Sequence, residues 1–540
     1  MTEAGEENRE SGERPRPARN ARRATPATLR VRALADALSP NELAKLGTQD
    51  VVGFLAPRRW FGAKAGAPTS ARIRDAILLP WETGHFAIAR LEVATAAGNP
   101  ALYQLPLCVR GMDEIGDALP KSILARVVAS EGAAEGLLFD AVEDGAFVRG
   151  LADAFAHGTS IGDPPRWIIE PLSAAAFVVP EGAPIRVGSA EQSNTSILIG
   201  EQAILKLFRK LEQGEHPELE LSRFLTIEAK FAHTPALLGI IRFDDDGRVT
   251  VAGTLMEYLP KSVDAWSYAL ERARPYFNAP RDRESPNAFL QDAERLGVVT
   301  RALHEALARG TGHDLVPEPA GPHMVDQWAA RARQSLRDAF SLLERQLRAG
   351  ALSKERAPEG EALVRRADHY LNVVDEIVST LHGDAGLAIR IHGDYHLGQV
   401  LRTARDDFMI IDFEGEPARS LGERRAKASP LRDVAGMLRS FAYASATLGM
   451  EAKGLDQGTR EVRIGRWERD TRDAFLRGYL RSDRRDVSAE RAILPADPEH
   501  TRALLRLFEL EKVFYELSYE LNNRPDWAWI PMRGIAKLLA

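Results

Sequence analysis

The pattern of apolar and polar positions changes along the chain, from a period of two near the start to a helical period later. Alternating apolar and polar side chains mark residues 71–82, 85–95 and 101–110, which predicts three strands. Upstream, Ser39-Pro-Asn-Glu42 has the sequence of a capping box with proline at the first helical position. It predicts a helix that ends near Leu55. Together these elements predict a small α+β module over residues 31–110.

A second strand-rich region follows within residues 111–262. Extended apolar runs over residues 195–200 and 203–208 are separated by Glu-Gln, and they predict a hairpin. A second hairpin is expected over residues 237–259, where an Asp-Asp-Asp-Gly turn separates two further extended runs. We therefore expect a subdomain built on a sheet.

Beyond Asp264 the helical period dominates, and residues 263–540 are expected to form a helical lobe. The periodic segments are residues 293–308, 325–347, 361–381, 431–443, 467–481 and 500–521. One β-hairpin interrupts this series, with strands at 399–403 and 408–413. The predicted fold is α+β: a bilobal, protein-kinase-like plan with an N-terminal α+β cap subdomain and a helical C-lobe.

Composition narrows the class of protein. Residues 1–30 are rich in Glu, Arg and Pro and almost free of large apolar side chains, so we expect a disordered tail. The net charge of −6 argues against nucleic acid as the main partner. The single cysteine, Cys108, excludes an intrachain disulfide. No apolar segment approaches a membrane span or a secretory signal, so we expect no membrane partner and a cytoplasmic enzyme or binding protein.

The segment 391–417 carries the clearest chemistry. Asp394 follows His-Gly and lies five residues before Gln399, which is the spacing of the kinase catalytic loop. Asp412 follows an apolar run, in the place of the aspartate that binds Mg²⁺ bridging the nucleotide phosphates. This pattern predicts Asp394 as the catalytic base and Gln399 and Asp412 as metal ligands, because carboxylate and amide oxygens suit Mg²⁺. A second His-Gly-Asp at 382–384 has Ile389 at the fifth position, which cannot bind metal, and is expected to be a turn.

Residues upstream predict an ATP site. Lys206 lies within a predicted strand, where a buried ammonium needs a charged partner. In the kinase plan it contacts the α- and β-phosphates and pairs with a helical glutamate, for which we choose Glu220 and, as second choice, Glu218. The loop 188–196 has the position of a phosphate loop, although it contains one glycine. The side chains expected to contact nucleotide there are Ser193, Asn194 and Thr195, and Glu257 and Leu259 are expected at the adenine hinge.

Several long motifs together resemble the actinobacterial maltokinases, relatives of the aminoglycoside phosphotransferases. The motifs are HGDYHLGQVL, IIDFEGEP, SPLRDVAGMLRSFAYA, RWFGAK, EQSNTSI and YELSYELNNRPDWAWIP. The resemblance implies ATP-dependent and Mg²⁺-dependent phosphorylation of maltose at its anomeric hydroxyl, giving maltose 1-phosphate for α-glucan synthesis. An enzyme of α-glucan or trehalose metabolism is the protein partner that it suggests. Tyr395 stands where the family usually has leucine.

The acceptor site is less clearly marked. Candidate sugar ligands are carboxylates, polar groups and aromatic rings that follow the catalytic motif or lie near the C-terminus. They are His396, Glu414, Glu416, Tyr519, Glu520, Arg524 and Trp527. Arg432 and Asp433 are expected to brace the catalytic loop rather than to touch the sugar. Two alternatives stay open: a related kinase for an aminosugar or aminoglycoside, and a nucleotide-binding regulatory module without turnover.

Overall fold

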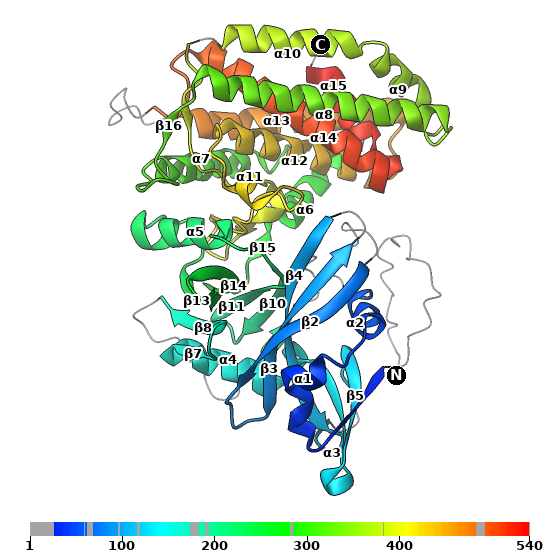
Figure 1. Cartoon of the computed structure of the whole chain (residues 1–540). Coiled ribbons are helices and arrows are strands. Elements are labelled where there is room, and N and C mark those ends of the chain that lie inside the picture. The colour runs from blue at the N-terminus through cyan, green and yellow to red at the C-terminus, as the bar shows by residue number, and fades with distance from the viewer. Residues whose placement is uncertain are drawn as a thin grey trace, which may run out of the picture. The chain divides into compact units, whose positions relative to one another are not determined.

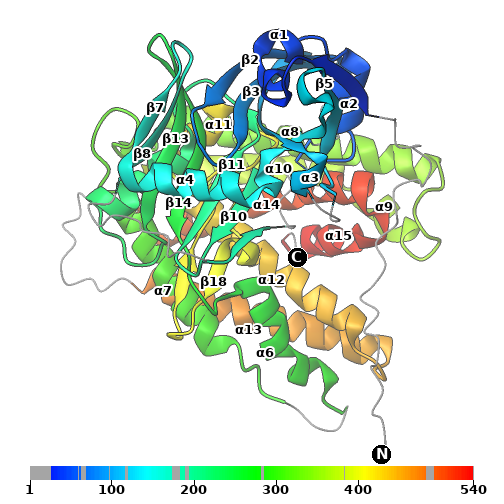
Figure 2. The ribbon, with the colours of Figure 1, turned by 90° about the horizontal axis from the view of Figure 1, so that it is seen from below.

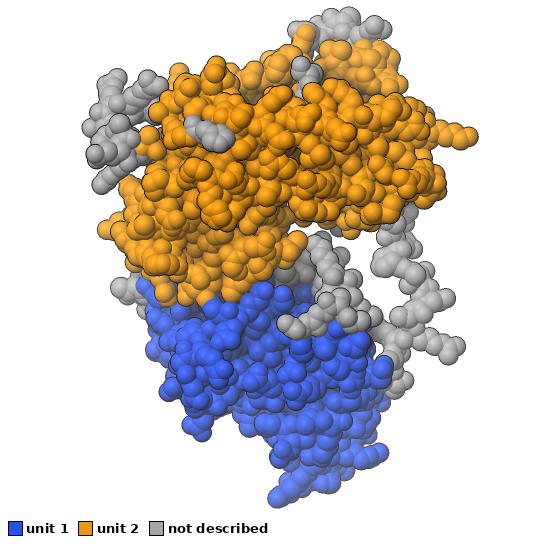
Figure 3. All heavy atoms as spheres, turned by 45° about the horizontal axis from the view of Figure 1, so that its top comes forward, with its two compact units in different colours: residues 1–200, 204–214, 239–255 blue, residues 201–203, 215–238, 256–540 orange. Residues whose placement is uncertain are grey.

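The computed structural model describes residues 26–58, 60–61, 68–95, 98–115, 119–172, 183–188, 194–280, 285–381, 383–481 and 492–538. The chain divides into two compact units (Figure 3). Unit 1 comprises residues 1–200, 204–214 and 239–255, and unit 2 comprises residues 201–203, 215–238 and 256–540.

The first sheet of unit 1 has the strand order β1-β5-β6-β4-β3-β2, and β12 joins it by pairing with β4. Its strands are β1 (Ala27–Val31), β2 (Pro68–Leu79), β3 (His85–Thr95), β4 (Gly98–Gly111), β5 (Ile123–Ala129), β6 (Glu135–Asp140) and β12 (Lys210–Leu211). The predicted helix is divided into α1 (Pro40–Leu43) and α2 (Thr48–Leu55). Ser39 Oγ accepts a hydrogen bond from the Glu42 N–H group at 3.4 Å, so Ser39 caps α1 as predicted.

Two predicted boundaries are wrong for this sheet. Residues 1–25 of the predicted tail lie outside the described residues, but residues 27–31 form β1, which pairs in parallel with β5. The module also continues past residue 110, because β4 pairs with β6 from Leu107 to Gly111. Strands β1 and β4 each pair with a strand that is distant in the sequence, and local composition does not reveal such pairings.

The second sheet of unit 1 has the order β7-β8-β13-β14-β11-β10-β9. Its strands are β7 (Thr159–Ile161), β8 (Arg166–Pro171), β9 (Ile185–Val187), β10 (Asn194–Ile199), β11 (Ala203–Phe208), β13 (Leu237–Asp245) and β14 (Arg248–Glu257). Both predicted hairpins, β10–β11 and β13–β14, are confirmed. Helix α4 (Gly145–His157) crosses one face of this sheet (Figure 2). A Cβ atom at Gly239 would lie 2.6 Å from the Phe155 ring, so glycine permits the close approach of α4 to β13.

Unit 2 is mainly helical, with α7, α8, α12, α13 and α14 as its long helices (Figure 1). Its helices are α5 (Pro217–Arg223), α6 (Ala265–Asn278), α7 (Leu290–Leu307), α8 (Pro322–Arg348), α9 (Ala357–Val364), α10 (Ala367–Thr380), α11 (Leu421–Arg425), α12 (Leu431–Glu451), α13 (Gln457–Leu480), α14 (Pro498–Asn523) and α15 (Trp529–Leu538). Its short strands are β15 (Val263–Asp264), β16 (Glu318–Pro319), β17 (Leu387–Ala388), β18 (Val400–Arg402) and β19 (Phe408–Ile410).

Helix α12 is the centre of the unit 2 core, because residues on all of its faces are buried. Its N-terminus lies beside the catalytic motif, where a Cβ atom at Gly436 would be 2.6 Å from the Tyr395 carbonyl oxygen. This packing brings the first turn of α12 to the loop that carries Asp394. Among the described residues, no helix has the length and apolar character needed to cross a membrane.

Candidate active site

Asp394 lies on a loop between β17 and a 3₁₀ turn at Leu397–Gln399. The loop is held by Asp433, in the first turn of α12. Its carboxylate accepts hydrogen bonds from the His392 N–H at 2.8 Å and the Gly393 N–H at 2.9 Å. Gly393 has φ of +83°, a conformation that favours glycine. The predicted bracing role of Asp433 is therefore visible in its contacts, and Asp394 is presented from a fixed backbone.

Asp433 is almost completely buried, but its surroundings favour the ionised form of its carboxylate. His304 Nε2 lies 3.2 Å from its carboxylate, and His304 Nδ1 lies 2.9 Å from the Tyr479 hydroxyl. Burial alone would raise the pKa of Asp433, but the hydrogen bond and charge of His304, the charge of His392 and the Gly393 N–H lower it below its usual value. A buried anion thus orients two successive N–H groups of the catalytic loop.

His392 connects the catalytic loop to the following strand. Its Nε2–H donates to the Ile411 carbonyl oxygen at 2.9 Å, so its Nδ1 faces the Asp394 N–H as an acceptor at 3.4 Å. Its ring packs against Tyr395, with the ring centres 5.3 Å apart. Tyr395 is buried, and its hydroxyl lies 2.8 Å from Thr300 Oγ1. The tyrosine that departs from the maltokinase motif is therefore a hydrogen-bonded core residue.

The strand that was predicted to end at a metal ligand leads into a group of three carboxylates. The Gln399 carbonyl oxygen accepts a hydrogen bond from the Ile411 N–H at 3.0 Å, and Asp412 follows with φ of +70°. One carboxylate oxygen each from Glu218, Asp412 and Glu414 lies within 4.8 Å of the other two. Glu218 comes from α5 and is buried. This set of hard oxygen donors fits Mg²⁺, and Gln399 lies at the start of the same hairpin.

A small hollow adjoins Asp394 and is lined by residues of unit 2. Lys512 of α14 places its Nζ atom 3.8 Å from Asp394 Oδ1. The charged residues that line this hollow are Asp394, Glu416, Arg419, Arg432, Asp433, Glu511 and Lys512, and Tyr515 adds a hydroxyl. The hollow therefore offers several donors and acceptors beside the predicted base, as a polyhydroxyl acceptor would need.

The charges of this hollow are paired within it. Arg419 donates to Glu416 at 2.8 Å, and Arg432 donates to Glu511 at 2.9 Å. Burial would raise the pKa of Glu416, but Lys512 and Arg419 lower it, so this carboxylate is ionised. Burial and the neighbouring Glu416 raise the pKa of Tyr515, which keeps its hydroxyl protonated. The hollow combines fixed anions with fixed cations in a partly buried setting.

The structure separates the predicted sugar ligands into two groups. His396 Nε2 lies 3.9 Å from Asp394 Oδ2, and Glu414 and Glu416 lie at the carboxylate group and the hollow. The other four form a separate cluster with Tyr443. Glu520 accepts from the Tyr443 hydroxyl at 2.9 Å and from Arg524, and the Trp527 ring stacks on Tyr443. Tyr519 lies under the Arg524 guanidinium. None of these four is among the residues that line the hollow beside Asp394.

The predicted nucleotide ligands of the strands lie in unit 1. Lys206 is in β11, and Asn194 and Thr195 are buried in β10. Thr195 Oγ1 accepts a hydrogen bond from Arg209 Nε at 2.8 Å, which gives this side chain a structural partner. Ser193 lies outside the described residues. The contacts of these residues with nucleotide stay a prediction.

The remaining predicted nucleotide residues, Glu220, Glu257 and Leu259, lie in unit 2. Glu220 is bound by Arg390 and by Arg425, the latter at 2.9 Å. Burial raises its pKa, but these two guanidinium groups lower it overall, so Glu220 is ionised and forms ion pairs with both arginines. Glu218, the second choice, belongs to the carboxylate group, and its pairing with Lys206 stays a prediction. At the predicted hinge, the Glu257 N–H donates to the Ala236 carbonyl oxygen and the Leu259 carbonyl oxygen accepts from Ser262.

Lys512, Glu511 and the metal-ligand geometry of Glu218 were not predicted from the sequence. Lys512 precedes Tyr515 by three residues, which places it one helical turn away on the same face. The spacing could have indicated Lys512, because Tyr515 lies on the same face of the predicted helix and a cation there would lie beside its ring. Glu218 had no such signal, because only the tertiary fold brings α5 to Asp412.

Comparisons with known proteins agree with this architecture. Residues 54–144 match the maltokinase N-terminal cap domain. A glucosamine kinase of Mycolicibacterium smegmatis is 28% identical over 65% of this chain and 78% of its own length. A glucosamine kinase of Streptacidiphilus jiangxiensis is 26% identical over 69% of this chain and 76% of its own.

Solved structures extend the likeness over most of the chain. Glucosamine kinase in complex with glucosamine, ADP and inorganic phosphate matches with a TM-score of 0.61 and 22% identity, over 92% of this chain and 98% of that one. Glucosamine kinase in crystal form B gives a TM-score of 0.63 over the same shares. The predicted kinase-like α+β fold is confirmed. The chain therefore belongs to the class of kinase-like α+β folds, with a cap, a β-sheet lobe and a helical lobe. Within this class, the named relatives are glucosamine kinases.

Proposed function

We propose that this protein is an ATP-dependent kinase that transfers the γ-phosphoryl group to a hydroxyl of a sugar. The observation that carries the proposal is the position of Asp394. Its carboxylate adjoins a hollow lined with polar groups, and its loop is hydrogen-bonded to the strand that leads to Asp412. The predicted base thus adjoins the acceptor space and shares a hydrogen-bonded segment with the predicted metal ligand Asp412.

The chemistry follows from the positions of these residues. Asp394 accepts a hydrogen bond from the acceptor hydroxyl and takes its proton as the oxygen bonds to the γ-phosphorus and ADP leaves. Asp412, with Glu218, Glu414 and Gln399 as further candidates, would hold Mg²⁺, which when bound neutralises charge on the phosphate oxygens. Lys206 is expected to contact the phosphates from β11. Asp433 and His392 keep the Asp394 backbone in place.

We propose glucosamine as the first acceptor. Two relatives named as glucosamine kinases support this choice, since the matches span more than three quarters of their lengths. The hollow adds three carboxylates that an ammonium group could approach, from Asp394, Glu416 and Glu511. Maltose is the second candidate. The cap-domain match over residues 54–144 favours it. Lys512 and the paired arginines favour it too, because their positive charges repel an ammonium group but not a neutral sugar.

A panel of matched acceptors tests the proposal. The purified chain is incubated with Mg·ATP and glucosamine, N-acetylglucosamine, glucose or maltose, and ADP release is followed. A glucosamine kinase releases ADP at least tenfold faster with glucosamine than with the other three sugars. Turnover with maltose and loss of its reducing end would transfer the proposal to the second candidate. ATP binding without transfer to any sugar would favour a regulatory module and overturn the kinase assignment.

A further inference from the structure

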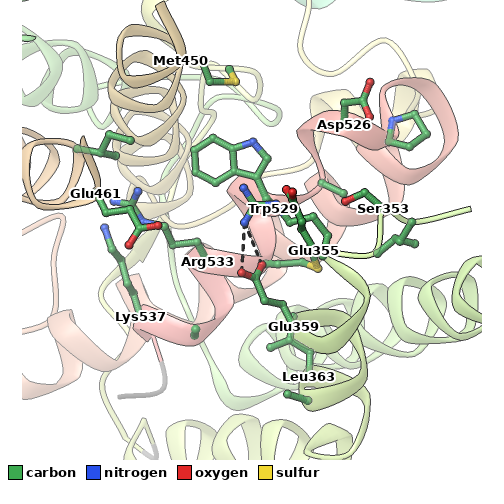
Figure 4. Close-up of a pocket in the computed structure, with 18 of the residues that line it drawn as sticks. Ser353, Glu355, Glu359, Leu363, Met450, Glu461, Asp526, Trp529, Arg533 and Lys537 are labelled. Carbon is green, nitrogen blue, oxygen red and sulfur yellow. Dashed lines mark hydrogen bonds and ion pairs between the residues drawn. The ribbon is translucent and has the colours of Figure 1, made fainter. Parts of the chain in front are cut away.

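A second hollow in unit 2 has a volume of about 850 Å³ (Figure 4). It is lined mainly by α9, α13, α15 and the segment that precedes α9, and it shares no lining residue with the hollow beside Asp394. Its volume is in the range of small-molecule sites, which is about 300–1,000 Å³. None of the predicted site residues lines it, so the kinase reaction leaves this hollow unexplained.

One part of the hollow is built around an aromatic ring. Figure 4 shows the Trp529 indole among the lining side chains, with Met450 on one side and Leu363 on another. The Arg356 guanidinium carbon lies 5.3 Å from the centre of the Trp529 ring, and Arg356 also donates to Glu359 at 3.2 Å. Such a half-buried indole offers a flat apolar surface on which a sugar or base ring can stack.

Another part of the hollow carries two cations that share one carboxylate. Arg533 and Lys537 lie one turn apart on α15, and both pair with the single carboxylate of Glu468, at 3.2 and 2.5 Å. Arg439, the next cation behind them, is already paired with Glu516. Burial lowers the pKa of Lys537, and the charges of Arg533 and Arg439 lower it further. A cluster in which cations repel one another gains from a bound anion.

Arg460 of α13 lines the same hollow. Its Nε atom is buried and has no hydrogen-bond partner among the described residues, while its Nη2 donates to the Leu455 carbonyl oxygen at 3.4 Å. Glu461, the carboxylate nearest in sequence, accepts a hydrogen bond from Gln457 at 2.9 Å. A buried guanidinium N–H without an acceptor is costly, and a phosphate oxygen would satisfy it.

We propose that this hollow binds an organic phosphate, with the phosphate group at Arg460, Arg533 and Lys537 and the ring of the ligand on Trp529. A sugar phosphate and a nucleoside monophosphate share this chemistry. The site is separate from the phosphoryl-transfer site, and its occupancy does not depend on which acceptor sugar the kinase uses.

Calorimetric titration of the full chain tests the proposal, with glucose 6-phosphate, AMP, inorganic phosphate and glucose as separate probes. One of the two organic phosphates is expected to bind at least tenfold more tightly than inorganic phosphate and glucose, and the better probe identifies the source of the ring. Lys537→Gln and Trp529→Ala should each weaken that binding at least tenfold. Arg348→Gln, an exposed arginine of α8 outside the hollow, should leave it unchanged.

Further variants keep the result interpretable. Ala362→Trp should block binding by filling the hollow from the exposed face of α9, without removing any ion pair. Glu416→Gln, in the hollow beside Asp394, should leave binding unchanged. The proposal is overturned if neither organic phosphate binds at millimolar concentration, or if Glu416→Gln weakens binding while Lys537→Gln and Ala362→Trp do not. Equal affinity for inorganic phosphate and both organic phosphates would also overturn it, because the ring would then contribute nothing.

Discussion

Asp394 is the residue whose replacement should separate chemistry from nucleotide binding. In Asp394→Asn the side chain keeps its size but cannot take the proton of the acceptor hydroxyl. We expect kcat to fall by about 10²–10⁴-fold, while the affinity for Mg·ATP changes less than about threefold. Steady-state kinetics and calorimetric titration of a non-hydrolysable ATP analogue measure the two effects. A variant that retains near-normal turnover would remove Asp394 from the role of base.

The structural role of Asp433 should make the free energy of unfolding depend on pH. Its folded-state pKa is lowered, so its ionisation stabilises unit 2 above the usual pKa of an aspartate, about 4, and this contribution is lost as pH falls through the folded value. An asparagine at this position would keep one acceptor oxygen and turn an NH₂ group toward N–H donors. Asp433→Asn should therefore lower the free energy of unfolding by about 2 kcal/mol at pH 7.

The pH series supplies the control for that prediction. Urea unfolding at pH 7, 5 and 3.5 should show the same difference between wild type and Asp433→Asn at pH 7 and 5 and a smaller one at pH 3.5, because below about pH 4 the wild-type carboxylate takes up a proton in the unfolded state. Asp375→Asn, at an exposed carboxylate that pairs with Arg333, should change the unfolding free energy by less than about 1 kcal/mol. A difference between wild type and Asp433→Asn that stays constant with pH would contradict the charged state of Asp433.

At the residue scale, the local motif predicted Asp394 and its neighbours better than their distant partners. Asp394 and Gln399 precede the β18–β19 hairpin and Asp412 follows it, so all three lie close together in the sequence as well as around this hairpin. The rejected motif copy at residues 382–384 fits a structural role, because Asp384 accepts hydrogen bonds from the Gly386 and Ala496 N–H groups. Lys512 reaches Asp394 only through the packing of α14, which no local spacing records.

The β18–β19 hairpin is the element that joins the predicted base to the predicted metal ligands. Strands β18 and β19 pair from Val400↔Ile410 to Arg402↔Phe408, and the left-handed backbone at Asp412 follows directly. This short ladder fixes Asp412 relative to the loop of Asp394 through the His392–Ile411 hydrogen bond. Changes in the hairpin should therefore affect metal binding before they affect the helical core.

Removing a carboxylate from the group at this hairpin should weaken metal binding. Asp412→Asn and Glu218→Gln are each expected to reduce Mn²⁺ affinity, measured in the presence of ADP by electron paramagnetic resonance, by about tenfold or more. Asp406→Asn, an exposed carboxylate in the turn of the same hairpin, is the matched control and should leave affinity unchanged. Unaltered affinity in both test variants would show that the metal binds elsewhere.

Helix prediction succeeded where apolar periodicity was long and failed where the chain breaks locally. The segments expected at 325–347 and 500–521 correspond to α8 and α14, each extended by a few residues. The single helix expected at 361–381 is two helices, α9 and α10, with a break at Arg365–Arg366. Arginines carry no strong helix-ending signal, so the break depends on packing rather than on propensity.

At the scale of the whole molecule, the bilobal plan could be predicted but the extent of its first sheet could not. The predicted boundary at residue 110 follows the end of an alternating pattern. The sheet continues into β5 and β6 because they pair across long stretches of chain, and the matched cap domain likewise ends at residue 144. Unit 1 then connects its two sheets through buried polar contacts that composition does not reveal.

Arg209 should control whether the two sheets of unit 1 unfold together. It follows β11, is 1% exposed, and donates to Asp140 at the end of β6 at 2.7 Å and to Thr195 of β10 at 2.8 Å. Arg209→Met would leave the Asp140 carboxylate buried without its cation. We expect the free energy of unfolding to fall by about 3–5 kcal/mol at pH 8. Arg72→Met, which removes the exposed Arg72–Glu92 pair of the first sheet, should cost less than about 1 kcal/mol.

The pH dependence of Arg209→Met distinguishes loss of charge pairing from loss of packing. Burial already raises the pKa of Asp140, and removing Arg209 would raise it further, so the variant would bind a proton in the folded state. A group whose folded-state pKa is raised loses stability as pH increases, so the destabilisation should be smaller at pH 5 than at pH 8. Urea unfolding followed by tryptophan fluorescence at both pH values measures it, and adding Asp140→Leu to Arg209→Met should recover stability at pH 8. Equal destabilisation at both pH values would mean that Arg209 contributes through packing against Trp60 rather than through its charge.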